Sequence, residues 1–260
     1  MARAGAGAPA WTKYSAGMAT TRRWRRASWT AMALTLVGIA LFVRLGIWQL
    51  DRAHEAQTLL DAFTHAANAA FEDFAAVSVN PPGSRFPHVR VRGHYVAGRG
   101  YLRDEQMRAG RPGVEAFAVF AIEGSAPQLL VDRGWIAWSH AAGAQPVLPS
   151  LPEGEVEVSG TYAPFPGSGL RLGGNALSTQ KNWPKLTLAV EHDEIAADLE
   201  QSLLPRVLLL DADAASGFER TWIPALMPPA RHTAYAFQWF AFAVAALAIF
   251  VLLHWKKVDK

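Results

Sequence analysis

The stretch RHTAYAFQWFAFAVAALAIFVLLHWKK, residues 231–257, decides the architecture of this chain. Between Thr233 and Leu253 it carries no formal charge, and two lysines follow it closely. A bilayer core of roughly 30 Å is crossed by about 20 helical residues, so residues 233–253 are predicted to form a transmembrane helix. The first turns also hold His, Tyr and Gln, which hydrocarbon penalises, so these residues need a separate explanation.

A second apolar run lies near the amino terminus. Between Trp29 and Trp48 the only formal charge is Arg44, which predicts a transmembrane helix over residues 29–50. Beyond it, polar and apolar residues continue at three- and four-residue spacing, which predicts a helical extension over residues 51–67. The Pro-Pro-Gly that begins at residue 81 cannot continue a helix.

Basic residues gather at the two ends of the chain. Residues 1–28 hold six basic side chains and no acidic one, and residues 254–260 hold three lysines against Asp259. Positive flanks stay on the cytoplasmic side, so we expect both termini there and the segment between the spans in the periplasm. The high Ala and Arg content favours a bacterial inner membrane over a mitochondrial one. The calculated pI near 9.3 reflects these tails, and we expect the lipid bilayer as a partner and no nucleic acid.

The segment between the two spans changes to a two-residue period. The runs HVRVRGHYV, VEAFAVFAIE, QLLVDRGWIAW and EVEVSGTYAP are separated by Gly or Pro turns, and RVLLLDAD adds a more buried strand. Ile195, Leu199 and Leu203 lie four residues apart, which predicts one amphipathic helix. The fold class is therefore α+β: two transmembrane helices flank a mainly antiparallel β domain, residues 68–228, with one or two helices.

The residue types disfavour several classes of site. The chain has no Cys, which excludes disulfides and thiolate metal sites. It also has no G-x-S-x-G nucleophile motif, so a membrane-tethered hydrolase is disfavoured and we expect no enzyme. Asp132 and Arg133 adjoin in a strand-like run, where we expect a structural ion pair rather than a catalytic one.

Polar and aromatic residues cluster where the second span begins. On a helix, His232, Tyr235 and Trp239 lie three and four residues apart, and Arg231 and Gln238 fall on the adjoining row with Tyr235. Tyr and Trp are common interfacial anchors, which explains the aromatics without any further function. His232 and Gln238 are explained less well, because polar groups in a span usually face a partner or a cofactor.

The motifs, taken in order, resemble one known family. LGIWQLDRA closes the first span, VRGHY, GRPGVEAFAVF, LLVDRGWI, GTYAPFP and NWPKL follow, and RHTAYAFQW opens the second span. With these motifs the chain is similar to the Surfeit locus protein 1 family of assembly factors for haem–copper oxidases. A lysine that the family often has after its first signature is absent, and Ala56 and Gln57 stand there.

The resemblance implies a role in maturing oxidase subunit I and the handling of haem a. It implies that His232 is the axial ligand of the haem iron, with Arg231, Tyr235, Gln238 and Trp239 around it. The family's GxWQxxR signature adds the matching positions Trp48, Gln49 and Arg52. Subunit I, and the machinery that makes haem a, are the implied partners.

Two alternatives remain open at this point. The chain could be a membrane scaffold for oxidase subunits that never touches haem. It could also be a two-span sensor with a ligand-binding outer domain, although only seven residues follow residue 253 and these are too few to form a signalling domain.

Overall fold

A computed structural model describes residues 21–24, 27–80, 85–139, 145–166, 176–222 and 227–258. The contacts within it divide the chain into two compact units. Residues 1–53 and 229–260 form one, called the helix-pair unit below, and residues 54–228 form the other, called the barrel domain. Helix α1, Trp29–Ala66, begins in the first unit and ends in the second.

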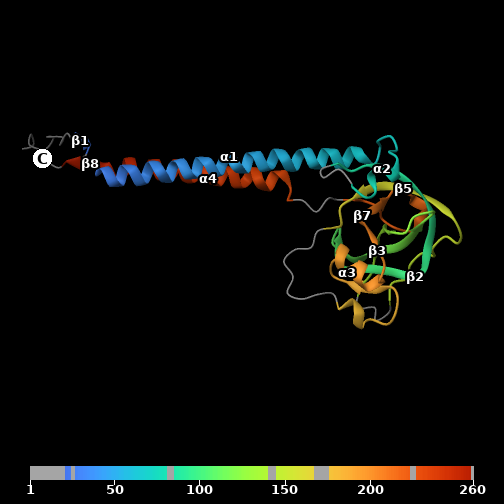
Figure 1. Cartoon of the computed structure of the whole chain (residues 1–260). Helices are drawn as coiled ribbons and strands as arrows, with labels where there is room; N and C mark the ends of the chain where they lie inside the picture. The colour runs from blue at the N-terminus through green and yellow to red at the C-terminus, as the bar shows by residue number, and fades with distance from the viewer. Residues whose placement is uncertain are drawn as a thin grey trace, which may run out of the picture. The chain divides into compact units, whose positions relative to one another are not determined.

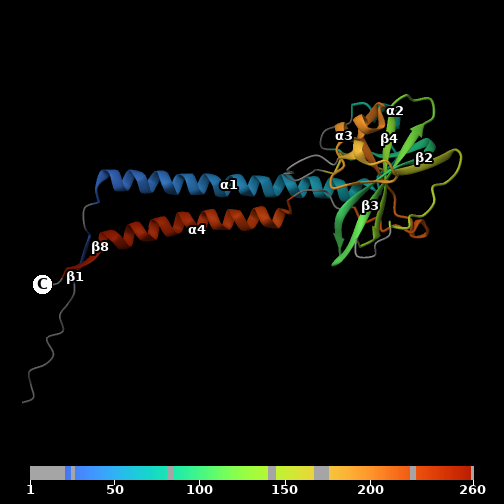
Figure 2. The same cartoon turned by 90° about the horizontal axis from the view of Figure 1, so that it is seen from below.

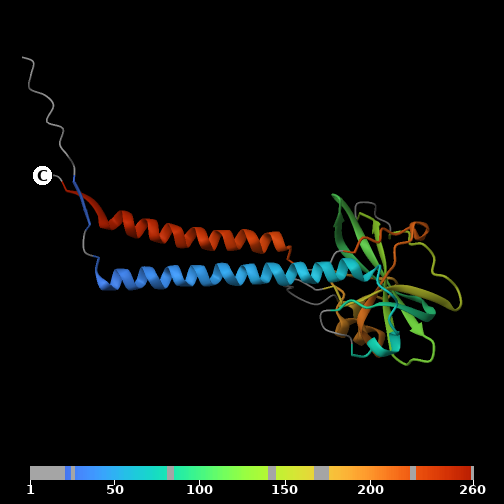
Figure 3. The ribbon, with the colours of Figure 1, turned by 90° about the horizontal axis from the view of Figure 1, so that it is seen from above.

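The helix-pair unit contains the two apolar helices. Helix α4 spans Pro229–His254 and runs antiparallel to α1 (Figures 2 and 3). Both helices are long and apolar enough to cross a membrane. Proline suits the first position of a helix, where its missing N–H would have had no partner. Two short antiparallel strands, β1 (Thr21–Trp24) and β8 (Trp255–Val258), pair next to the start of α1 and the end of α4.

The barrel domain is built on a sheet that closes on itself (Figure 1). Its strands are β2 (His88–Arg108), β3 (Arg111–Ile122), β4 (Gln128–Ala137), β5 (Val156–Ala163), β6 (Lys185–Thr187) and β7 (Leu203–Leu210). Around the ring the strands follow in the order β3, β4, β7, β5 and β2, and each pairs with the next. β2 also pairs with β3, which completes the ring. Only β4–β7 and β2–β6 are parallel. Closure leaves the five ring strands without an open edge.

The long strand β2 closes the ring by serving two neighbours. Its first residues pair with β5, its later residues pair with β3, and Gly93 pairs with both Val156 and Ile122. A Cβ at Gly93 would overlap the carbonyl oxygen of Ala121, so only glycine fits this crossing. Further along, Tyr95 faces Phe120 and Gly100 faces Ala118. Residues 96–99, the β2 bulge, therefore stand opposite a single residue of β3.

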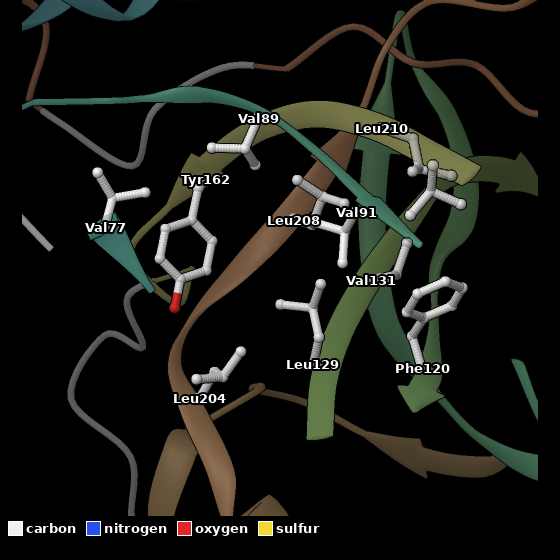
Figure 4. Packing of buried hydrophobic residues seen from close by; sticks show 11 residues of the cluster. Val77, Val89, Val91, Phe120, Leu129, Val131, Tyr162, Leu204, Leu208 and Leu210 are labelled. Carbon is white, nitrogen blue, oxygen red and sulfur yellow. The ribbon is translucent and has the colours of Figure 1, made fainter. Parts of the chain in front are cut away.

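Apolar side chains from all five ring strands fill the largest buried cluster (Figure 4). Tyr162 is fully buried there, and its hydroxyl donates to the carbonyl of Ser78 at 2.8 Å. Ser78 follows the short helix α2, Phe74–Val77, whose Val77 belongs to the same cluster. A buried hydroxyl needs such a partner, so this bond ties α2 to the strands.

The structure confirms the predicted fold class and corrects one element. Helix α3 spans His192–Leu199, and short 3-10 turns lie at Leu177–Thr179 and Ala214–Ser216. The spacing of Ile195, Leu199 and Leu203 predicts a single helix that includes all three residues, but Leu203 is the first residue of β7. The helix stops earlier because Glu200 adopts a left-handed conformation with φ 55°.

The predicted ion pair between Asp132 and Arg133 is also wrong. Asp132 pairs with Phe117 and Gly134 pairs with Ala116, so Arg133 is the extra residue of a β-bulge in β4. The two side chains have separate partners. The carboxylate of Asp132 accepts the backbone N–H of Gly134 at 3.1 Å. The Nη2 of Arg133 instead donates to the carbonyls of Pro149 and Ser150 at 2.8 and 3.1 Å.

Candidate functional site

The first turn of α4 holds a histidine that is bonded to α1. The Nδ1 of His232 lies 2.9 Å from the Oε1 of Gln49, and both side chains are half-buried. The bond joins residues that are 183 positions apart in the chain. It therefore links the two helices at the end of the pair where α4 begins.

This bond sets the chemical character of the imidazole. An amide oxygen only accepts hydrogen bonds, so Nδ1 carries the proton in this arrangement and the neutral ring keeps its lone pair on Nε2. Within the described residues Nε2 has no hydrogen-bond partner. Histidines that bind metals typically donate their other ring N–H to an oxygen in this way, which fixes both tautomer and orientation.

Aromatic side chains fill the space between the helices beyond His232. Trp239 stacks on Phe42 with ring centroids 6.0 Å apart and an angle of 24° between the rings. Phe242 lies 5.8 Å from Phe42 and 5.9 Å from Trp239. A Cβ at Gly46 would lie 2.6 Å from the ring of Phe240, so the glycine leaves room for that ring. The result is an aromatic cluster that begins about two helical turns from the histidine along α4.

The contact positions follow the spacing of a coiled coil. On α4 they are His232, Ala236, Trp239 and Ala243, separated by four, three and four residues. On α1 they are Phe42, Gly46 and Gln49, separated by four and three. Such a repeat keeps one face of each helix toward its partner.

The other residues of the α1 signature make a local pair. The guanidinium of Arg52 lies 5.8 Å from the ring centroid of Trp48, and both side chains are exposed. On α1, Trp48 precedes Gln49 and Arg52 follows it. Neither residue shares the contact of Gln49 with His232. This pair places a positive charge within about one helical turn of Gln49.

Three of the predicted residues of α4 lie away from α1. Arg231, Tyr235 and Gln238 are exposed, whereas His232 and Trp239 are half-buried. The structure thus divides the predicted cluster into two faces. His232, Gln49 and Trp239 belong to the face between the helices, and Arg231, Tyr235 and Gln238 form a separate polar row on α4.

The sequence reasoning missed Phe42 and Phe240. The signal for Phe42 was its seven-residue distance from Gln49, which equals that between His232 and Trp239 and puts each pair on one helix face.

Among the described residues no cluster of three or more His, Cys, Asp or Glu side chains forms a metal site. Metal binding here would therefore rest on a single histidine and a prebuilt cofactor.

Comparison with known proteins identifies the family of the chain. The chain matches no curated protein. The sequence pattern of the SURF1 family matches residues 36–244, which is most of the chain. The match includes the strands of the barrel, Phe42, Gly46 and Gln49 on α1, and the part of α4 that begins with His232. The chain has two apolar helices, with the strands of the sheet between them in the sequence, and the family match runs continuously through all of these elements. The chain therefore belongs to the SURF1 family.

Proposed function

We propose that this protein is an integral-membrane assembly factor that receives haem a on His232 and assists its delivery to subunit I of a haem–copper oxidase. The SURF1 family is known for oxidase assembly factors rather than enzymes. The observation that carries the proposal is the bond from His232 Nδ1 to Gln49, which leaves Nε2 available as a ligand.

The residues around His232 fit the chemistry of a haem. When bound, haem supplies an iron that accepts a neutral imidazole as axial ligand. His232 would donate the Nε2 lone pair, and Gln49 would hold the ring. Phe42, Trp239 and Phe240 offer apolar contact to a macrocycle. Arg231, beside His232 in the first turn of α4, would pair with a propionate, as would Arg52 on α1.

The decisive experiment is a haem difference spectrum of purified full-length protein in detergent. We expect wild type to bind haem a and His232→Ala to bind it weakly or with a changed spectrum. His254→Ala is the matched control, because this histidine lies at the other end of α4, where its Nδ1 contacts the carbonyl of Phe250 at 2.7 Å. Unchanged binding by His232→Ala would remove the ligand assignment. Failure of wild type to bind haem would leave the scaffold alternative.

One observation supports direct contact with an oxidase subunit. Gln238 is exposed on α4, about 9 Å along the helix from His232 at 1.5 Å per residue. An amide at membrane depth needs a hydrogen-bond partner, and polar residues of spans commonly find it on another helix. Tyr235 and Gln238 are therefore the part of this polar row that we assign to subunit I.

Co-purification separates the two faces of α4. We expect Gln238→Leu to reduce the amount of subunit I that co-purifies with the tagged protein and to leave haem binding unchanged. Gln49→Leu is the matched control, since it removes the same side chain from the face between the helices and should have the opposite effects. Equal co-purification of subunit I with wild type and Gln238→Leu would contradict the assignment.

A further inference from the structure

A small cavity opens beside the β2 bulge in the barrel domain. Its volume is about 190 Å³, and Gly98, Arg99 and Gly100 form one side of it. Phe117, Trp183 and Leu148 contribute apolar walls, and Arg133 reaches it from β4. The volume corresponds to about six water molecules at about 30 Å³ each. The cavity thus accepts a molecule with one ring and is too small for a porphyrin.

Arg133 brings a buried positive charge to this cavity. The residue is 8% exposed, and the ring of Phe218 lies 4.7 Å from its Cζ. Among the described residues no carboxylate is within ion-pair distance of its guanidinium. The segments of this domain outside the described residues, 81–84, 140–144, 167–175 and 223–226, contain neither Asp nor Glu. The charge therefore has no internal counterion.

The surroundings of Arg133 make this charge costly. Burial lowers the pKa of the guanidinium, the interaction with Tyr95 opposes this, and the nearby positive charge of Arg220 lowers the pKa again. Buried cations in proteins are normally paired with an anion. A tether for the chain at Pro149 and Ser150 explains the two bonds from Nη2. It does not explain why a full charge is used, or why the side chain also lines a cavity.

A second arginine stands at the same cavity. The Cζ of Arg99 lies 4.8 Å from the ring centroid of Trp183, and within the described residues Arg99 also has no carboxylate partner. Residues 96–99 are outside the regular β2–β3 pairing because of the bulge. Bulges often re-aim side chains at binding sites. Here the bulge brings Arg99 to the cavity that Arg133 lines.

We propose that this cavity is a binding site for a small carboxylate with an apolar or aromatic body. The carboxylate would lie between the guanidiniums of Arg133 and Arg99, since arginine pairs with carboxylates through parallel N–H bonds. The ring would contact Phe117 and Trp183. Such a ligand is either a free single-ring acid or the carboxyl-terminal residue of a peptide. The site is separate from the face of His232 and does not depend on haem.

The test uses full-length protein in detergent and ¹⁹F NMR of 4-fluorobenzoate. We expect line broadening on binding and much weaker binding of 4-fluorobenzamide, which has the same ring without the charge. Arg133→Gln should weaken binding of the acid by on the order of tenfold, as expected for loss of a charged hydrogen bond. Arg99→Gln should weaken it severalfold. Arg92→Gln, which alters an exposed arginine paired with Glu157, should leave it unchanged.

Two further measurements keep the result unambiguous. If Arg133→Gln does not fold, Arg99→Gln decides the question, because the recorded contact of Arg99 is with the ring of Trp183 and not with the backbone. A peptide ending in Phe, with a free or an amidated terminus, distinguishes a chain terminus from a free acid by its affinity relative to 4-fluorobenzoate. Equal binding of acid and amide, or unchanged binding in Arg99→Gln, would overturn the proposal.

Discussion

At the scale of single residues, the pair of His232 and Gln49 combines stability with chemistry. Each polar group would be costly in an apolar setting, and the bond between them offsets part of that cost. The same bond fixes which nitrogen carries the proton. A structural contact therefore also prepares the imidazole for a ligand.

Replacement of Gln49 tests whether its bond fixes the tautomer of His232, and the tautomer can be measured without haem. In Gln49→Leu the acceptor is lost, so His232 can place its proton on Nε2 and block the lone pair. We expect ¹⁵N NMR of histidine-labelled protein to show the Nδ1–H tautomer in wild type and a mixture in the variant. Haem affinity should fall by on the order of 10–100-fold, the usual effect of losing such a supporting contact.

Gln49→Glu is the conservative control for this experiment. It keeps an oxygen at the same position, so the Nδ1–H tautomer and most of the haem affinity should return. If Gln49→Leu and wild type show the same tautomer, the bond does not orient the ring, whatever the haem result is.

A second residue-scale prediction concerns Asp132. Burial raises the pKa of its carboxyl group well above the usual range, and the charge of Glu115 raises it further, while Arg103 opposes both. Because the folded-state pKa is higher than the unfolded one, the protonated group favours folding at low pH, and this contribution is lost as the pH rises through the folded pKa. Asp132 therefore costs stability at neutral and alkaline pH.

Asp132→Asn should remove this cost and keep the bond from the N–H of Gly134. We expect the variant to gain about 2–4 °C in Tm at pH 8, which corresponds to about 1 kcal/mol, and less at pH 5. Thermal unfolding of both proteins at the two pH values measures it. Glu153→Gln, at an exposed position, should show no such difference. A gain that is larger at pH 5 would contradict the pKa argument.

At the scale of elements, the helix pair depends on one glycine in α1. A Cβ at Gly46 would press on Phe240, whereas a Cβ at Gly38 would have nothing within 4 Å. Both glycines lie in the same helix and cost it similar propensity. They form a matched pair for testing close approach of the helices.

Gly46→Leu should push the helices apart, and Gly38→Leu should not. The chain has no Cys, so spin labels can be placed on introduced cysteines at the exposed positions Leu41 and Leu247. We expect a longer distance between the labels in Gly46→Leu by pulsed electron spin resonance, together with weaker haem binding. The same distance in both variants would show that Phe240 moves aside without cost.

Sequence patterns were informative about elements and much less so about their pairing. The spans follow from length and hydropathy, and the strands from a two-residue period, because both signals are local. Closure of the ring depends on pairs such as Leu130 and Val207, which no local pattern encodes. The position of His232 could be identified, but its bond to Gln49 required the register between two helices. The partners of Arg133 could not be identified either, because they are backbone carbonyls of Pro149 and Ser150, which no local pattern links to β4.

At the scale of the whole molecule, the charge distribution predicts the orientation in the membrane. We expect reporter fusions at residue 15 and at the carboxyl terminus to give cytoplasmic signals, and a fusion near residue 168 to give a periplasmic one. The reason is that basic flanks remain on the cytoplasmic side. A cytoplasmic signal from residue 168 would contradict the charge argument.

The place of β7 in the ring has a consequence for biosynthesis. β7 is the last ring strand to be made, and it lies between β4 and β5. Until Leu210 has left the ribosome, β4 and β5 both keep an open edge, and such edges invite pairing with other chains. The ring of the growing protein therefore stays incomplete until more than two thirds of the chain has been synthesised. Protection by a chaperone would matter most during this interval.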